Sequence, residues 1–164
     1  MTVRPEDFRA AGGRFASGVT VVTAAHAGKV YGITASAFSS VSLDPPQVLV
    51  CVARTSKLHE MVVEGKTFAV SILANDQREL SELFAKPDRE PVESFVELDV
   101  PHVLHATGTP VLRGCVAFFD CTLARAYDGG DHSIFVGDVR AAGLGAERPP
   151  LLYFNRGYRG ITDL

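Results

Sequence analysis

Short runs of β-branched and apolar residues, separated by turn signals, constrain this fold more than any other feature of the sequence. Residues 19–24 follow a glycine and lead through a turn at 26–29 into residues 30–35. Two such runs joined by a short turn predict an antiparallel hairpin. Similar runs recur at 47–53, 67–73, 115–126, 133–139 and 151–154. The sequence therefore predicts a mainly β fold of about six or seven antiparallel strands, closed as a barrel or stacked as a sandwich.

Two of these strands carry further information. The run at 47–53 is almost continuously apolar, which is typical of a strand covered on both faces. Asp44, Pro45 and Pro46 precede it and are expected to end any regular structure there. A turn at 127–131 is expected to separate the last long strands.

A few short helices complete the prediction. Residues 1–10 indicate a helix, with Phe8 and Phe15 as apolar anchors. Residues 57–64 carry apolar side chains at helical spacing, and Gly65 is expected just beyond the last turn. Asp76 followed by Glu79 predicts the N-cap of a third helix. Pro87 should end that helix, and residues 87–110 are expected to be loop and short strand.

Composition favours one globular domain over residues 1–164. The chain has 46% hydrophobic and 21% charged residues and a net charge of −3, which is ordinary globular usage and unpromising for nucleic-acid binding. No apolar run could span a membrane, and the first residues do not resemble a secretory signal. Cys51, Cys115 and Cys121 form no C-x-x-C pair, so we expect three buried thiols in a cytoplasmic protein.

Common nucleotide and metal motifs are absent from the sequence. No G-x-G-x-x-G follows a strand, and there is no P-loop, G-x-S-x-G or H-E-x-x-H. A dinucleotide, if bound, is not held in the Rossmann manner. His102 and His105 are spaced to meet, but no third ligand is near them in the sequence. Two exposed loop histidines are the favoured interpretation, and no metal is expected.

Two hydroxyl-rich segments are candidates for a binding rim. Residues 34–40 combine four Ser or Thr side chains with small or aromatic ones, so a ligand could approach the backbone there. Residues 54–57 open a helix with hydroxyls and a lysine, a combination that favours an anion. The alternatives are an ordinary loop at 34–40 and simple N-capping by Thr55 or Ser56. Neighbouring strands could bring the two segments to one rim.

Residues 129–132 form a third candidate. Two glycines suit a tight hairpin turn, which is the plain interpretation. Asp131 and His132 add a titratable pair that a turn does not require. A carboxylate can fix the tautomer of an imidazole, and histidine suits a carboxamide or a phosphate.

Taken together, these blocks resemble the short-chain flavin reductases that serve two-component flavin-dependent monooxygenases. The resemblance runs from Phe8 to Tyr158, and the S-V-S-L-D-P-P and G-D-H blocks are its most specific parts. It rests on the segments at 15–24, 32–46, 48–57, 68–77, 80–85, 108–114, 129–139 and 150–154.

The resemblance implies a fold, a reaction and partners. The fold would be a split β-barrel, antiparallel with a few short helices, in a homodimer. The reaction would be reduction of free FAD or FMN by NADH or, less often, NADPH. The reduced flavin would then leave for a separate monooxygenase. Two alternatives stay open: a flavin-binding split barrel without turnover, and a purely structural dimer or interaction module.

The resemblance also implies residue roles. Thr34, Ala35, Ser36 and Ala37 would line the isoalloxazine, although many members carry Ser or Asn at position 37. Cys51, Val52 and Ala53 would pass their backbone near the flavin, Ser56 and Lys57 would hold its phosphate, and Phe84 and Ala85 would contact the rest. Asp131 and His132 would face the nicotinamide, with Tyr153 nearby. His132 is the expected catalytic-site residue, positioning the nicotinamide for hydride transfer.

Overall fold

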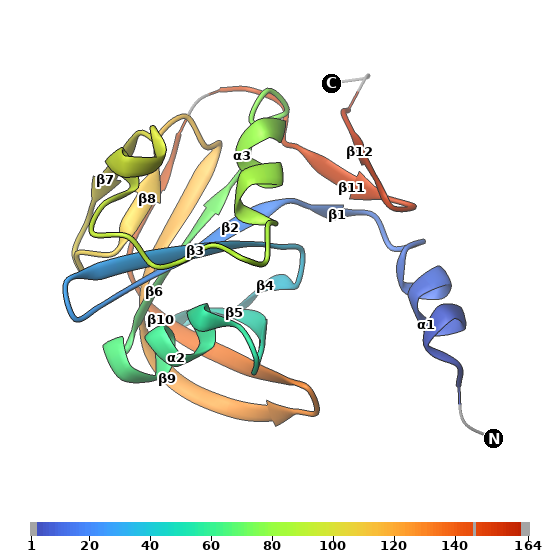
Figure 1. The fold of residues 1–164 in the computed structure, drawn as a ribbon, viewed down its shortest axis with the longest axis horizontal. Coiled ribbons are helices and arrows are strands. Elements are labelled where there is room, and N and C mark those ends of the chain that lie inside the picture. The colour runs from blue at the N-terminus through green and yellow to red at the C-terminus, as the bar shows by residue number, and fades with distance from the viewer. Residues whose placement is uncertain (1–2, 146, 162–164) are drawn as a thin grey trace.

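The chain folds into antiparallel sheets with a few short helices. The computed structural model describes residues 3–145 and 147–161 (Figure 1). Its helices are α1 (Pro5–Gly12), α2 (Lys57–Gly65) and α3 (Arg78–Phe84), with a 3-10 turn η1 (Phe95–Leu98). Its strands are β1 (Ser17–Gly18), β2 (Thr20–His26), β3 (Lys29–Ala35), β4 (Phe38–Leu43), β5 (Pro46–Ala53), β6 (Thr67–Ile72), β7 (His102–Leu104), β8 (Pro110–Leu112), β9 (Ala117–Gly129), β10 (His132–Leu144), β11 (Leu152–Phe154) and β12 (Gly157–Arg159).

One large sheet dominates the described residues. Its seven strands run in the order β3-β2-β6-β9-β10-β5-β4, and every neighbouring pair is antiparallel. A three-stranded sheet has the order β1-β11-β12, and β7 pairs with β8. The prediction of a mainly β, antiparallel fold is confirmed.

The strand count was underestimated. Twelve strands occur in the described part of the chain, because β1, β7, β8 and β12 are only two or three residues long. The serine-rich strand β4 also escaped the prediction, because most of its side chains are exposed and it lacks an apolar run. Asp44 and Pro45 form the tight turn of the β4–β5 hairpin, so regular structure resumes at Pro46 and does not stop there.

Strand β5 was expected to be covered on both faces, and this was wrong. Its burial alternates along Pro46–Ala53, with Val48, Val50 and Val52 pointing into the core. The side chains between them are only half-buried. The run looks continuously apolar in the sequence because the half-buried positions that alternate with the valines, Leu49, Cys51 and Ala53, are also apolar.

The β9–β10 hairpin is longer than predicted. Its strands continue to Gly129 and resume at His132, so the turn consists only of Gly130 and Asp131. Gly130 has a φ of 81°, the left-handed region in which glycine carries no steric penalty. The hairpin therefore carries Asp131 and His132 at its tip.

The ends of two helices correct the sequence analysis. Gly65 is the last residue of α2, and Lys66 adopts the left-handed cap with a φ of 58°. Glycine is needed at 65 because a Cβ there would lie 2.3 Å from the carbonyl oxygen of Ala25. Asp76 does not cap α3, since Gln77 precedes the helix and Asp76 pairs with Arg148.

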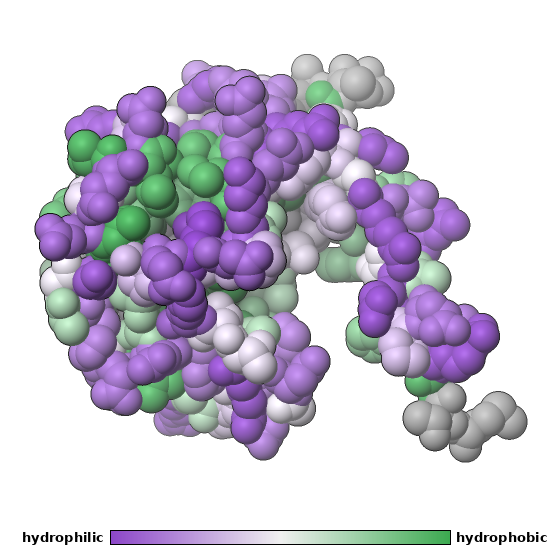
Figure 2. Space-filling model, viewed as in Figure 1, coloured by the Kyte–Doolittle hydropathy of each residue, from purple (hydrophilic) through white to green (hydrophobic). Residues whose placement is uncertain are grey.

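Helix α1 is not anchored to the core as expected. Phe8 is 72% exposed and Phe15 is 80% exposed, and none of the helix residues is buried. Figures 1 and 2 show this helix standing off from the body, with an open hollow between them. Phe8 and Phe15 are therefore apolar surface groups within one chain.

The core fills the inside of the large sheet. One cluster gathers side chains from β2, β5, β6 and α2, and a second lies under α3 and η1. Cys115 and Cys121 are buried as expected, and burial raises the pKa of the Cys121 thiol to about 12. Cys51 is only half-buried, so the expectation of three buried thiols was wrong at that position.

Candidate functional site

Three elements from distant parts of the sequence meet at the first candidate site. The end of β3 contributes Thr34, Ala35 and Ser36, and the end of α3 contributes Ser81 and Ala85. The β11–β12 hairpin adds Tyr153 and Tyr158. These residues, with Val19, line a cavity of about 240 Å³ that we call the tyrosine pocket. Its small side chains leave room beside the backbone of β3.

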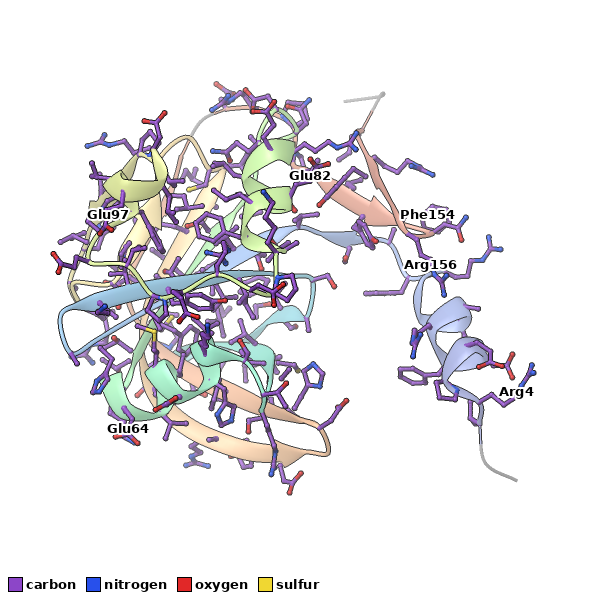
Figure 3. All side chains as sticks on the ribbon, in the orientation of Figure 1. Arg4, Glu64, Glu82, Glu97, Phe154 and Arg156 are labelled. Carbon is purple, nitrogen blue, oxygen red and sulfur yellow. The ribbon has the colours of Figure 1, made fainter. Side chains whose placement is uncertain are left out.

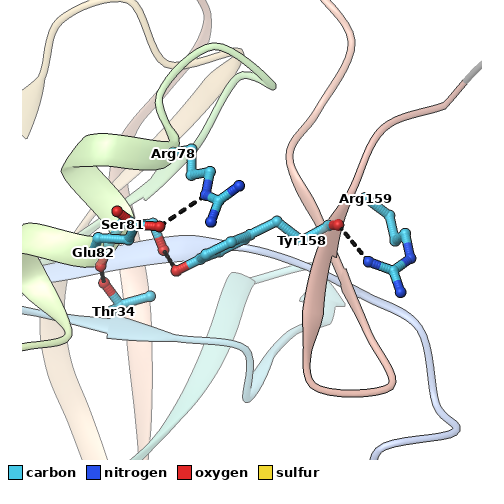
Figure 4. Close-up of polar contacts among 6 residues, drawn as sticks. All are labelled: Thr34, Arg78, Ser81, Glu82, Tyr158 and Arg159. Carbon is cyan, nitrogen blue, oxygen red and sulfur yellow. Dashed lines mark hydrogen bonds and ion pairs between the residues drawn. The ribbon is translucent and has the colours of Figure 1, made fainter.

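A chain of hydrogen bonds fixes the walls of the tyrosine pocket (Figure 4). The Thr34 hydroxyl donates to the Ser81 carbonyl oxygen at 2.6 Å. The hydroxyls of Ser81 and Tyr158 lie 2.9 Å apart, and Ser81 is fully buried. The guanidinium of Arg78 lies 5.1 Å from the centre of the Tyr158 ring. The C-terminal hairpin is thus tied through α3 to the strand that carries Thr34.

A second cavity continues from the first. Thr34 and Ala85 line both cavities, and the second also includes Ser56, Lys57 and Phe84. It measures about 290 Å³, and we call it the lysine pocket. The expectation that residues 34–40 and 54–57 share a rim is confirmed for Thr34, Thr55, Ser56 and Lys57.

The start of α2 makes this pocket suitable for an anion. The Ser56 hydroxyl accepts a hydrogen bond from the backbone N–H of Leu58, so Ser56 is the N-cap. Lys57 follows it and donates from Nζ to the Arg89 carbonyl oxygen at 3.0 Å and to Glu90 Oε1 at 2.5 Å. A lysine beside free helix N–H groups favours a negatively charged ligand.

The tip of the β9–β10 hairpin borders a separate cavity. His132 pairs with Ala53 and Ile134 with Cys51 across β10 and β5. Cys51, His132 and Ile134 line a groove of about 710 Å³, together with Ala37, Asp131 and residues of α1. We call it the histidine groove. It lies on the opposite face of β5 from the core valines.

Asp131 and His132 form the predicted pair. Asp131 Oδ1 lies 2.7 Å from His132 Nδ1, and this hydrogen bond holds the pKa of Asp131 below its usual value. Arg54 joins the hairpin tip to the end of β5 through an ion pair with Asp128 of 3.1 Å. The pair is exposed, with 93% of the Asp131 side chain and 44% of the His132 side chain accessible.

A second histidine supports the hairpin from inside. His59 of α2 lies 2.8 Å from the hydroxyl of Ser133, through its Nε2. Burial and the nearby Arg54 lower the pKa of His59, which favours its neutral form. Ser133 precedes the buried Phe135 on the inner face of β10, so His132 points to the outer face.

The structure brings together most, but not all, of the predicted residues. Tyr153 lines the tyrosine pocket and not the histidine groove, so it does not join His132 within one chain. The side chains of Val52 and Phe84 are core residues, which leaves Val52 only its backbone to offer. Burial raises the pKa of Cys51, so this thiol is not activated as a nucleophile.

Sequence reasoning missed Ser81 and Tyr158. Ser81 lies one helical turn before Phe84 on α3, on the same buried face. Tyr158 follows a turn at Asn155 and Arg156, both of which have positive φ. In the sequence, Asn155 is a residue that favours turns, and it could have indicated a second strand after 151–154. That strand carries Tyr158 back over the pocket.

The described residues offer no metal site. No group of three or more His, Cys, Asp or Glu side chains that could hold a metal ion occurs among residues 3–145 and 147–161. His105 stacks on Phe118 with ring centres 4.2 Å apart, and His102 Nδ1 lies 3.1 Å from the Val100 carbonyl oxygen. His102 begins strand β7 and both histidines are half-buried, so the expectation of two exposed loop histidines was wrong.

The two continuous pockets define a class of binding protein. Small residues, hydroxyls and two tyrosines suit a flat polar ring, and the lysine at the start of α2 suits a phosphate joined to it. A flavin mononucleotide has this combination of groups, so the described residues fit a flavin nucleotide. In this fold, the site lies on antiparallel β structure and not at the helix of a Rossmann unit.

Comparison with known proteins agrees with that class. Residues 12–162 match the family model described as "Flavin reductase like domain", and the chain belongs to this family. It is 41% identical to the reductase component of 4-hydroxyphenylacetate 3-monooxygenase from Thermus thermophilus, over 96% of this chain and 97% of that protein. It is 40% identical to an NADH-dependent FAD reductase from Streptomyces globisporus, over 90% of this chain and 80% of that protein.

Solved structures show the same fold at similar identity. The flavin reductase BorF, from a bacterial two-component tryptophan halogenase, has a TM-score of 0.89 and 40% identity, covering 98% of this chain and all of BorF. The NADH:FAD oxidoreductase SgcE6 from Streptomyces globisporus, in complex with NAD and FAD fragments, has a TM-score of 0.86 and 37% identity. That match covers 97% of this chain and 95% of SgcE6.

The length and hydropathy of the helices bear on whether any of them could span a membrane. Across the part of the chain that the structure describes, none of the helices is long and apolar enough to cross a membrane.

Proposed function

We propose that this protein is an NAD(P)H-dependent flavin reductase that reduces free FAD or FMN, with NADH and FAD favoured. The observation that carries the proposal is the continuity of the tyrosine and lysine pockets through Thr34 and Ala85. The ring of the flavin would lie against residues 34–36, and its phosphate would meet Ser56 and Lys57. When bound, the nicotinamide and the flavin would themselves supply the chemistry of hydride transfer.

The protein would contribute positioning. The hydrogen bonds that link Thr34, Ser81 and Tyr158 would keep the wall of the tyrosine pocket in place beside the flavin. His132, oriented by Asp131, would hold the nicotinamide in position for hydride transfer. Ala37, Cys51 and Ala53 would offer backbone between the two sides, since Ala37 and Cys51 line the groove that contains His132.

The assembly is part of the proposal. We infer a split β-barrel in one domain, residues 1–164, working as a cytoplasmic homodimer. The exposed apolar residues Phe8 and Phe15 support the dimer, since a symmetric partner could cover them. The reduced flavin would be released to a separate monooxygenase component.

A second candidate function is flavin binding without turnover. The fit of the tyrosine and lysine pockets would serve this function equally well. The exposed Asp131 and His132 pair favours the reductase, because a flavin store needs no nicotinamide contact.

Turnover separates the two functions. Purified protein is mixed with excess FAD, FMN or riboflavin, and the oxidation of NADH and of NADPH is followed by absorbance. We expect many turnovers per protein, fastest with NADH and FAD. Quenching of flavin fluorescence without NADH oxidation would favour flavin binding without turnover. If neither quenching nor NADH oxidation were seen, both functions would be contradicted.

A further inference from the structure

Arg54 begins the segment 54–57, but the flavin side of the site does not account for it. The three residues that follow it line the lysine pocket. The guanidinium of Arg54 instead contacts the β9–β10 hairpin, at the Asp128 carboxylate and at the carbonyl oxygen of His132. Figure 3 shows the tip of this hairpin at the lower edge of the body, beyond the end of β5. Arg54 is therefore placed to act on the nicotinamide side.

Arg54 holds the hairpin tip through three contacts. Its backbone N–H donates to the Asp131 carbonyl oxygen at 3.0 Å, which extends the pairing of β5 with β10 beyond Ala53 and His132. Its Nε donates to the His132 carbonyl oxygen at 3.4 Å. Its Nη2 lies 3.1 Å from Asp128 Oδ2 on β9. One side chain therefore ties both strands of the tip to the end of β5.

Asp128 has a second partner in the same turn. Its Oδ1 accepts a hydrogen bond from the backbone N–H of Gly130 at 2.8 Å, the local closure typical of an Asx turn. This bond and the nearby Arg54 hold the pKa of Asp128 below its usual value, so the carboxylate is charged at neutral pH. The two oxygens of Asp128 thus serve different partners, one the turn and the other Arg54.

The ion pair between Arg54 and Asp128 is exposed, so its effect on position can be separated from its effect on stability. The exposed fractions of the two side chains are 46% and 78%. Pairs of this kind contribute little to the free energy of unfolding. The inner face of the tip has its own support, because the buried Ser133 lies 2.8 Å from His59 Nε2. Loss of the Arg54 guanidinium should therefore leave the hairpin folded and change how closely its tip is held.

We propose that Arg54 is a positioning residue for hydride transfer, which holds the β9–β10 tip, and with it His132, in one place relative to the flavin. This inference rests on the proposed function, in which His132 holds the nicotinamide. A tip that samples several positions presents His132 in the productive one for only part of the time, and the rate falls by that fraction. Arg54 thus acts through His132 and not on a nucleotide.

The test removes the ion pair from each side separately. Arg54→Met removes the guanidinium but keeps a long side chain. Asp128→Asn removes the charge but keeps an oxygen that can accept from the Gly130 N–H, so the turn is preserved. Stopped-flow mixing of FMN-loaded protein with saturating NADH gives the rate constant for flavin reduction. Fluorescence titration gives the Kd for FMN, and a thermal melt gives the Tm.

Two control variants make the same charge changes away from the ion pair. Arg125→Met alters an exposed arginine of the same hairpin, which donates to the Tyr127 hydroxyl. Glu64→Gln alters a carboxylate that Figure 3 shows pointing outward near the end of α2. A further comparison introduces Arg54→Met into the His132→Ala variant, because a residue that acts through His132 has nothing left to position there.

We expect Arg54→Met and Asp128→Asn each to slow flavin reduction by about threefold, within the range of an exposed ion pair. The Kd for FMN and the Tm should stay unchanged in both variants. The two control variants should match the unmodified protein in all three quantities. Added to His132→Ala, Arg54→Met should give no further loss of rate.

Two results would overturn the inference without affecting the proposed function. One is an unchanged rate constant in both ion-pair variants, whatever happens to the Kd for FMN and the Tm. Weaker FMN binding as the sole effect would place Arg54 on the flavin side, and a lower Tm as the sole effect would give it a structural role. The other is a full further loss of rate when Arg54→Met is added to His132→Ala. Absence of flavin reduction by NADH in the unmodified protein would instead contradict the proposed function, and this inference with it.

Discussion

The tyrosine pocket and the histidine groove lie in one chain but are supported in different ways. The tyrosine pocket depends on Ser81, which is fully buried: its carbonyl oxygen accepts a hydrogen bond from the Thr34 hydroxyl, and its own hydroxyl is hydrogen-bonded to that of Tyr158. The histidine groove depends on Asp131 and His132, which are exposed at a hairpin tip, and on α1, which has no buried residue. One side is therefore prebuilt by packing, whereas the other can be altered without disturbing the core.

The largest effect is expected on the flavin side at Lys57. Lys57→Ala should weaken FMN binding by about tenfold to a hundredfold and leave riboflavin unchanged, because a charge-assisted contact contributes about 1.5–3 kcal/mol. Fluorescence titration with FMN and riboflavin measures the difference. Lys57→Arg, which keeps the charge, should retain most of the FMN affinity. Equal binding of FMN and riboflavin by the unmodified protein would remove Lys57 from the site.

On the other side, His132→Ala should slow hydride transfer. Loss of a positioning contact costs on the order of tenfold in the rate constant for flavin reduction. Stopped-flow mixing of flavin-loaded protein with NADH measures that rate constant. His132→Gln, which keeps a hydrogen-bond donor, should recover part of it. A lower melting temperature and weaker flavin binding, with hydride transfer unchanged, would mean that His132 serves only the hairpin turn.

Tyr158 allows a test of the contrast in burial between the tyrosine pocket and the exposed surface. Tyr158→Phe removes the hydroxyl that bonds to the buried Ser81, and the free energy of unfolding should fall by about 1 kcal/mol. Tyr127→Phe is the matched control, because Tyr127 is 48% exposed and should give no measurable change. Denaturant titration of the two variants compares them directly. Equal stability of both would show that the tyrosine pocket is no better supported than the surface.

The smallest effect is expected at Glu90. Glu90→Gln removes the carboxylate that competes with a phosphate for Lys57, so FMN should bind more tightly by up to about fivefold, the range of an exposed ion pair. Glu93→Gln makes the same charge change in the same loop, without a contact to Lys57 among the described residues. Titration at low salt separates the two. An equal gain in both variants would indicate a general charge effect.

The sequence predicted the parts of the molecule that depend on local pattern. The β-branched runs predicted β2, β3 and β6. Ser56 as a candidate N-cap and the helical spacing of the apolar residues after it predicted α2. The rim formed by Thr34 and Lys57 followed from two hydroxyl-rich segments at strand ends. The Asp131 and His132 pair could be read directly, because the two residues are adjacent.

The remainder depends on contacts that no local pattern records. Ser81 and Tyr158 are 77 residues apart, and only the fold brings their hydroxyls together. Strand β4 is exposed and rich in serine, so it was hidden among turn-like residues. The position of Tyr153 also depended on tertiary structure, because the β11–β12 hairpin folds toward α3 and not toward the β9–β10 tip.

The separation of the two sides is tested most directly by measuring the Kd for FMN and the reduction rate constant at saturating FMN in Lys57→Ala, His132→Ala and the double variant. We expect Lys57→Ala to change only the Kd and His132→Ala to change only the rate constant. The double variant should show the two effects combined without coupling, as is usual for independent sites. A change of both quantities in either single variant, or a strong coupling in the double variant, would contradict two separately supported sides.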